Sequence, residues 1–145
     1  MSAFIGKGGD AASLLLRVSL GVMYLTHSIL LKVFTFGFAG TAGYFASLGL
    51  PSFTAYVVIA AEVIGGVLLL ANVATGWVAL ALLPILGGAF WVHSGNGWVF
   101  SATGGGWEYP LFLIVVSVAV ALQYFAARSV AANRSPVFGS AAQQA

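Results

Sequence analysis

The sequence predicts an all-α integral membrane protein, built as a bundle of four transmembrane helices. Of its 145 residues, 61% are hydrophobic and only 6% are charged, and the mean hydropathy is +1.04. A soluble domain carries about 25% charged residues because its surface must be wetted, so lipid must surround most of this chain. Apolar stretches of about 20 residues, the length that crosses a bilayer, recur four times. Together they use most of the chain and predict a single transmembrane domain.

The four spans are predicted at residues 12–33, 53–71, 77–92 and 109–125. Pro84 lies inside the third span, where it should kink the helix. Pro110 lies in the first turn of the fourth span, where proline is favourable. The tail, residues 126–145, is rich in small and polar residues, and we expect it to be flexible.

The segment between the first two spans, residues 34–52, is uncharged and rich in Phe and Gly. Its hydrophobicity should hold it at the membrane, while its glycines argue against another full span. We therefore expect a hydrophobic interfacial or re-entrant loop with a short helix near residues 41–48. In contrast, residues 93–107 are rich in glycine and polar side chains and predict a loop in water.

The basic residues outside the spans predict the orientation. Lys7, Arg128 and Arg134 flank the termini, whereas the far side has only Lys32. Cytoplasmic loops carry the excess of Lys and Arg, so both termini should lie on the cytoplasmic side of the membrane. The first apolar run contains Arg17 and does not end in a clear cleavage site, so we expect a retained span rather than a signal peptide.

Several function classes are disfavoured by composition. The chain has no cysteine, which excludes disulfides, thiol catalysis and iron–sulfur clusters. Its five basic residues are scattered, so no nucleic-acid partner is expected. No spacing typical of a zinc site is present, and no metal is predicted. The triplet Gly104-Gly105-Gly106 follows no predicted strand, so it is weak support for phosphate binding.

Glu62 is the most informative residue because it falls near the middle of the second span. A charge there costs about 2.5–3.5 kcal/mol on insertion scales, so the side chain must face the bundle interior, be protonated or meet a cation. Gly65 and Gly66 share its helix face and would let a neighbouring helix approach. Glu62 is therefore either a proton carrier or acceptor for a buried head group, or one half of a structural pair with Arg17, Lys32 or a backbone group.

The other ionisable side chains extend this picture. His27, Lys32, His93 and Glu108 all fall in or near the outer leaflet in this topology, with Glu62 just below them. Such a set could relay protons or hold a quinone carbonyl, although Glu108 alone is explained by the dipole of the helix that it opens. Arg17 either reaches the cytoplasmic surface or turns inward. The candidate polar pocket thus comprises Glu62, His27, Lys32, His93, Glu108 and Arg17.

A quinone is the cofactor that this pattern favours. A haem bound by two histidines is disfavoured, because His27 lies about 9 Å inside its helix end at 1.5 Å per residue, whereas His93 ends its own helix. No redox centre is evident in the chain itself.

Short motifs occur along the chain in a distinctive order. They are Arg17-x-x-x-Gly21, His27 and Lys32, then Leu48-Gly49-Leu50-Pro51, Ala61-Glu62-Val63-Ile64-Gly65-Gly66, Gly88-Ala89-Phe90, His93-Ser94-Gly95-Asn96-Gly97-Trp98 and Gly104-Gly105-Gly106-Trp107-Glu108-Tyr109-Pro110. From about residue 13 to residue 125, this order resembles the DoxX family of small bacterial membrane proteins. Ser28 departs from the pattern, since the family usually has glycine after the histidine of span one.

The resemblance implies a four-helix membrane bundle that serves as a subunit of a respiratory or redox complex, similar to thiosulfate:quinone or terminal quinol oxidase systems. It also implies roles for the six residues of the candidate pocket. The expected partners are the lipid bilayer and a larger membrane complex or a second copy. Two other classes remain open, namely a purely structural accessory subunit and a small transporter for protons or a neutral solute.

Overall fold

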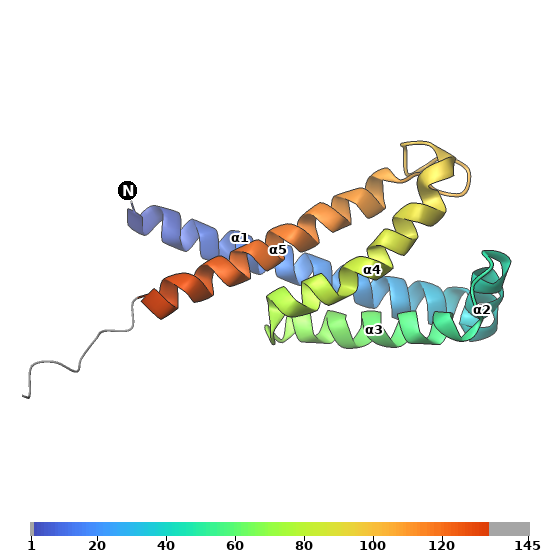
Figure 1. The fold of residues 1–145 in the computed structure, drawn as a ribbon, viewed down its shortest axis with the longest axis horizontal. Coiled ribbons are helices and arrows are strands. Elements are labelled where there is room, and N and C mark those ends of the chain that lie inside the picture. Colours follow the sequence, from blue (N-terminus) through green and yellow to red (C-terminus); the bar gives the residue numbers. More distant parts are fainter. Residues whose placement is uncertain (1, 134–145) are drawn as a thin grey trace, which may run out of the picture.

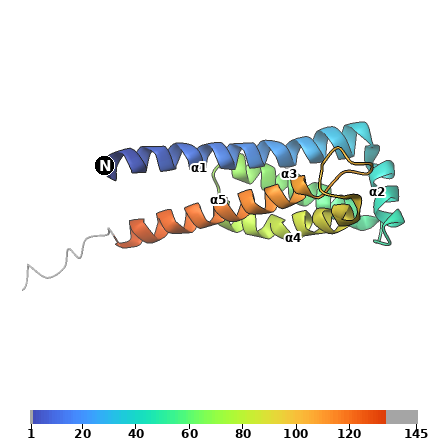
Figure 2. The same cartoon turned by 90° about the horizontal axis from the view of Figure 1, so that it is seen from above.

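The computed structural model describes residues 2–133, which are helical apart from short turns and one longer loop and contain no strand. In chain order the elements are α1 (Ser2–Leu25), the π-helix η1 (Thr26–Thr35), α2 (Gly37–Ser47), α3 (Phe53–Leu70), α4 (Thr75–His93), the short 3₁₀ helix η2 (Ser94–Asn96) and α5 (Glu108–Asn133). The long helices run alongside one another, and α2 lies across one end of the bundle (Figures 1 and 2). We call this the α2 end and the opposite one the termini end.

The predicted all-α membrane bundle is confirmed. Four helical segments are long and apolar enough to cross a bilayer, at Ala11–Thr35, Phe53–Leu70, Thr75–Asn96 and Glu108–Asn133. Large apolar side chains such as Leu15 and Trp77 are 67% and 62% exposed, as expected where lipid is the solvent. The short helix expected in the interfacial segment is α2, which begins four residues earlier than predicted.

The expectation of a flexible tail from residue 126 is wrong for residues 126–133. Helix α5 continues through them to Asn133, because alanine and arginine in this stretch favour the helix. Arg128 also folds back onto the previous turn, where its guanidinium lies 5.5 Å from the centre of the Tyr124 ring and Nη1 donates to the Tyr124 hydroxyl at 3.2 Å. The rest of the predicted tail, residues 134–145, lies outside the described residues.

Glycines set the close contact between α1 and α3. A Cβ on Gly66 would lie 2.9 Å from Leu25 and 3.0 Å from the backbone oxygen of Gly21. Gly65, on the same helix, is approached by Leu82 of α4, whose Cδ1 would lie 2.6 Å from an added Cβ. The predicted close approach at span two is therefore confirmed.

Gly87 and Gly88 in α4 make no such close contact. Both are exposed, and a Cβ built on either would meet no atom within 4 Å. The contacts of α4 with its neighbours run instead through Ala79, Leu82 and Leu86, which are buried on another face of the helix.

Gly66→Ala should destabilise the fold, whereas Gly88→Ala should not. The added methyl at position 66 meets the Gly21 backbone, and overpacking of this kind costs about 1–3 kcal/mol. At position 88 the methyl meets open space, and alanine gains about 0.8–1.0 kcal/mol of helix propensity. Thermal unfolding of both variants in the same detergent checks this pair. Equal melting temperatures would show that α1 and α3 do not approach as described.

Candidate functional site

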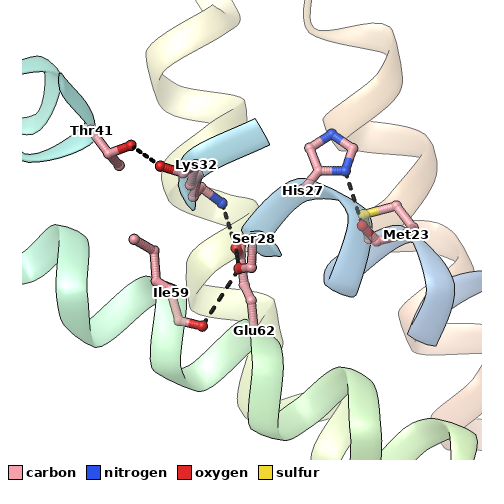
Figure 3. Close-up of polar contacts among 7 residues, drawn as sticks. All are labelled: Met23, His27, Ser28, Lys32, Thr41, Ile59 and Glu62. Atoms are coloured by element: carbon pink, nitrogen blue, oxygen red, sulfur yellow. Dashed lines mark hydrogen bonds and ion pairs between the residues drawn. The ribbon is translucent and has the colours of Figure 1, made fainter. Parts of the chain in front are cut away.

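Glu62 lies inside the bundle, where two side chains of η1 contact its carboxylate (Figure 3). It is 5% exposed. Its Oε2 accepts hydrogen bonds from the Ser28 hydroxyl and the Lys32 ammonium group, and the Lys32 contact is also an ion pair. Of the partners considered from the sequence, Lys32 is the one that meets Glu62. Two protein groups thus supply the polar contacts that a carboxyl group inside an apolar bundle requires.

The residues that face Glu62 lie on the π-helix η1. Ser28 and Lys32 lie one turn apart and both point toward α3, while His27 points away from Glu62 (Figure 3). The Thr41 hydroxyl of α2 donates to the Lys32 backbone oxygen at 2.8 Å and ties the end of η1 to α2. π-Helical turns are rare and occur frequently at functional sites. No sequence signal used above predicted this one.

His27 is held by its own helix and by α5. Its Nδ1 lies 3.0 Å from the backbone oxygen of Met23. A carbonyl only accepts, so we assign the hydrogen to Nδ1 and a lone pair to Nε2 in the neutral ring. The ring also stacks on Tyr109, with centroids 5.8 Å apart and an interplanar angle of 21°. His27 thus belongs with Tyr109 and not with the Glu62 cluster.

His93 and Glu108 organise the loop that joins α4 to α5. His93 Nδ1 lies 2.9 Å from the Gly104 oxygen, and the Glu108 Oε1 accepts the Phe100 amide at 2.8 Å. Three glycines make the loop feasible. Gly104 and Gly105 have φ values of +82° and +80°, and a Cβ on Gly106 would lie 2.1 Å from the Val99 oxygen. The glycine triplet is therefore a structural requirement of this loop.

Arg17 lies away from the other candidates. Its Nη1 donates to the backbone oxygens of Leu69 and Leu70, which end helix α3. An arginine there donates to carbonyls of the last helical turn and complements the helix dipole. Arg17 therefore turns inward to a structural contact.

The six predicted residues thus do not form one pocket. The structure brings Glu62 and Lys32 together and adds Ser28, which the sequence had marked only as a departure. His27 joins Tyr109, His93 and Glu108 shape the loop, and Arg17 caps α3. Among residues 2–133, no three His, Asp or Glu side chains lie close enough to hold a metal ion.

A groove of about 490 Å³ lies at the start of α5, beneath the loop. It is lined by Trp98, Phe100, Glu108, Tyr109, Leu111, Phe112 and Val115. Its walls are aromatic and aliphatic apart from the Glu108 carboxylate and the Tyr109 hydroxyl, and Tyr109 links it to His27. Sequence reasoning named Glu108 but missed the aromatic wall, although its aromatic residues cluster between positions 98 and 112.

The DoxX family model matches residues 12–95, a stretch that includes α3, α4 and the Lys32–Glu62 pair. The chain belongs to the DoxX family. It is 36% identical over 119 residues to the Bacillus subtilis (strain 168) protein named "Putative oxidoreductase CatD", covering 81% of this chain and 83% of that protein. No solved structure matches the chain significantly.

Membership and the four apolar helices identify this DoxX protein as a multi-pass membrane protein. In this chain Ser28, which replaces the usual glycine of the family, has a defined contact. Its fully buried hydroxyl supplies the second hydrogen bond to Glu62.

Lys32→Met should destabilise the protein strongly, because it leaves the Glu62 carboxylate buried without its cation. Removal of one partner of a buried pair costs about 3–5 kcal/mol. The double variant Lys32→Met/Glu62→Gln has no charge left at this place and should recover most of the loss. Chemical unfolding in detergent measures both, and a Lys32→Met protein as stable as the wild type would refute the pairing.

Proposed function

We propose that this DoxX protein is a membrane subunit of an oxidoreductase system and that the groove at the start of α5 binds the ring of a quinone or quinol. The observation that carries the proposal is the groove itself, with aromatic walls, one carboxylate and one phenol, placed beside the His27–Tyr109 stack. The name of the Bacillus relative supports the general class of reaction.

The lining suits the two chemical parts of such a ligand. A flat quinone ring stacks well on Phe, Tyr and Trp side chains, and the groove offers Trp98, Phe100, Tyr109 and Phe112. The apolar tail of a membrane quinone would continue along exposed residues of α5 such as Val115, which is 59% exposed. No residue of the groove other than Glu108 carries a charge.

The polar groups suit the ring oxygens. The Tyr109 hydroxyl can donate a hydrogen bond to a carbonyl, and the Glu108 carboxylate can accept one from a quinol hydroxyl. His27, with its lone pair on Nε2, lies against the Tyr109 ring and is a nearby acceptor for a released proton. Glu62 does not line the groove, so the quinone contact first expected at Glu62 moves to Glu108 and Tyr109.

A bound quinol would pass its two electrons to a partner enzyme in a larger membrane complex and release its two protons to the site. The chain has no cysteine for thiol or iron–sulfur chemistry, so its own part is to hold the ring and accept protons. We further propose that the protein lies in the bacterial plasma membrane with both termini on the cytoplasmic side. In this orientation the groove lies on the outer side of the membrane.

Phe112→Ala should weaken binding of a short-chain quinone about tenfold, because loss of an aromatic stacking partner costs about 0.5–1.5 kcal/mol beyond its buried area. Quenching of tryptophan fluorescence by the quinone in nanodiscs measures the affinity, since Trp98 lines the groove. Phe53→Ala is the matched control. Phe53 is 64% exposed and Phe112 is 61% exposed, but Phe53 lies on α3, outside the groove.

Equal affinity in wild type, Phe112→Ala and Phe53→Ala would show that the quinone only partitions into lipid. That outcome would refute the groove as a quinone site and favour the alternative of a purely structural accessory subunit.

A further inference from the structure

Two contacts with the loop above the groove hold Glu108 in place. Its backbone amide donates to the Trp98 oxygen at 3.1 Å, and its Oε1 accepts the Phe100 amide at 2.8 Å. The same loop is braced by the rings of Trp98 and Trp107, which pack edge to face with centroids 4.5 Å apart. The carboxylate therefore has a defined position in the wall of the groove, which Glu108 lines, before any ligand binds.

Glu108 gives the groove a negative charge that no other lining residue balances. It is the acidic residue in the first turn of α5, where the helix dipole favours a negative charge. The other lining residues are aromatic or aliphatic, so the groove has no lysine, arginine or histidine of its own. The groove thus favours a ligand that brings hydrogen-bond donors to the carboxylate.

The hydrogen-bonding capacity of Glu108 distinguishes the two redox forms of the ligand. In the part of the chain that the structure describes, Oε1 has the Phe100 amide as its donor and Oε2 has no protein donor. The oxygens of a quinone only accept, whereas the two hydroxyls of a quinol also donate. A quinol hydroxyl at Oε2 makes a hydrogen bond to a charged acceptor, which is about twice as strong as a neutral one. A quinone oxygen at the same place meets only repulsion.

The Tyr109 hydroxyl, in contrast, suits both forms. A phenol hydroxyl donates and accepts, so it can donate to a quinone oxygen or pair with a quinol hydroxyl. Its ring is held by the stack on His27, at 5.8 Å between centroids. Among the residues that line the groove, discrimination between the redox forms therefore depends on Glu108.

We propose that Glu108 makes the groove selective for the quinol over the quinone. This inference rests on the site proposed above and names the redox form that the site takes. Tighter binding of the reduced form raises the midpoint potential of the bound couple, by about 30 mV for each tenfold preference in a two-electron couple. The groove thus holds the quinol until the partner enzyme oxidises it, and then releases the more weakly bound quinone.

The preference is measured in nanodiscs with tetramethyl-1,4-benzoquinone and its quinol. Quenching of tryptophan fluorescence gives the quinone affinity, and displacement of the quinone under anaerobic conditions gives the quinol affinity. Empty nanodiscs correct both for partition into lipid. The wild type should bind the quinol at least tenfold more tightly, a difference of about 1.4 kcal/mol. Equal affinities of the wild type for the two forms would overturn the proposal.

Glu108→Gln assigns the preference to the carboxylate. The amide side chain keeps an oxygen that can accept the Phe100 amide, so the melting temperature should stay near the wild-type value. Its NH₂ group can donate to a quinone oxygen, so the quinol preference should fall to none or reverse. Tyr109→Phe is the matched control and should weaken both forms while the preference remains. A preference in Glu108→Gln as large as in the wild type would show that Glu108 does not select the quinol.

Phe112→Ala separates failure of this proposal from failure of the quinone site. It should weaken both forms by a similar factor, because both have a flat ring that stacks on the Phe112 side chain. If it does so while the wild type shows no preference, the site stands and only the selectivity fails. If it weakens neither form, the site fails and the selectivity with it.

Discussion

The buried contact between Glu62 and Lys32 is the constraint on which the arrangement of the first three helices depends. A carboxylate in hydrocarbon has no water to solvate it, so α3 must present it to the one helix that offers a cation and a hydroxyl. The small residues Gly21 and Gly66 then allow the α1 and α3 backbones to come close enough for that contact. The polar contacts of Glu62 and the glycine contacts reinforce each other, because both join α3 to the continuous segment formed by α1 and η1.

The other ionisable side chains follow the same rule with backbone partners. Arg17 satisfies carbonyls at the end of α3, His93 meets a loop carbonyl, and Glu108 accepts a loop amide. The His93 and Glu108 contacts fold the loop between α4 and α5 over the start of α5, where aromatic side chains from both segments form the groove. His93 and Glu108 each have a structural role in the loop, and together they shape a groove with mostly apolar walls. Ligand pockets commonly have such walls.

The sequence predicted most of the polar residues that make specific contacts inside the bundle. It did not predict which of them contact one another. Each polar side chain in an apolar span stands out because its burial is costly. Their grouping depends on the direction in which each side chain points. On η1, His27 stacks on Tyr109 of α5, while Ser28 and Lys32 face α3. The sequence analysis grouped His27 with Glu62 by depth along the helix alone, and depth does not say which neighbouring helix a side chain meets.

The sequence by itself determined that this protein is a four-helix membrane bundle, because hydrophobic length and scarce charge leave lipid as the only suitable solvent. It also determined that Glu62 must have a partner. Only the tertiary structure decided that the partner is Lys32 with Ser28 and that Gly66 is packed while Gly88 is open. Those outcomes depend on contacts between helices, and a bilayer constrains each helix to be apolar without specifying which of its faces meets a neighbour.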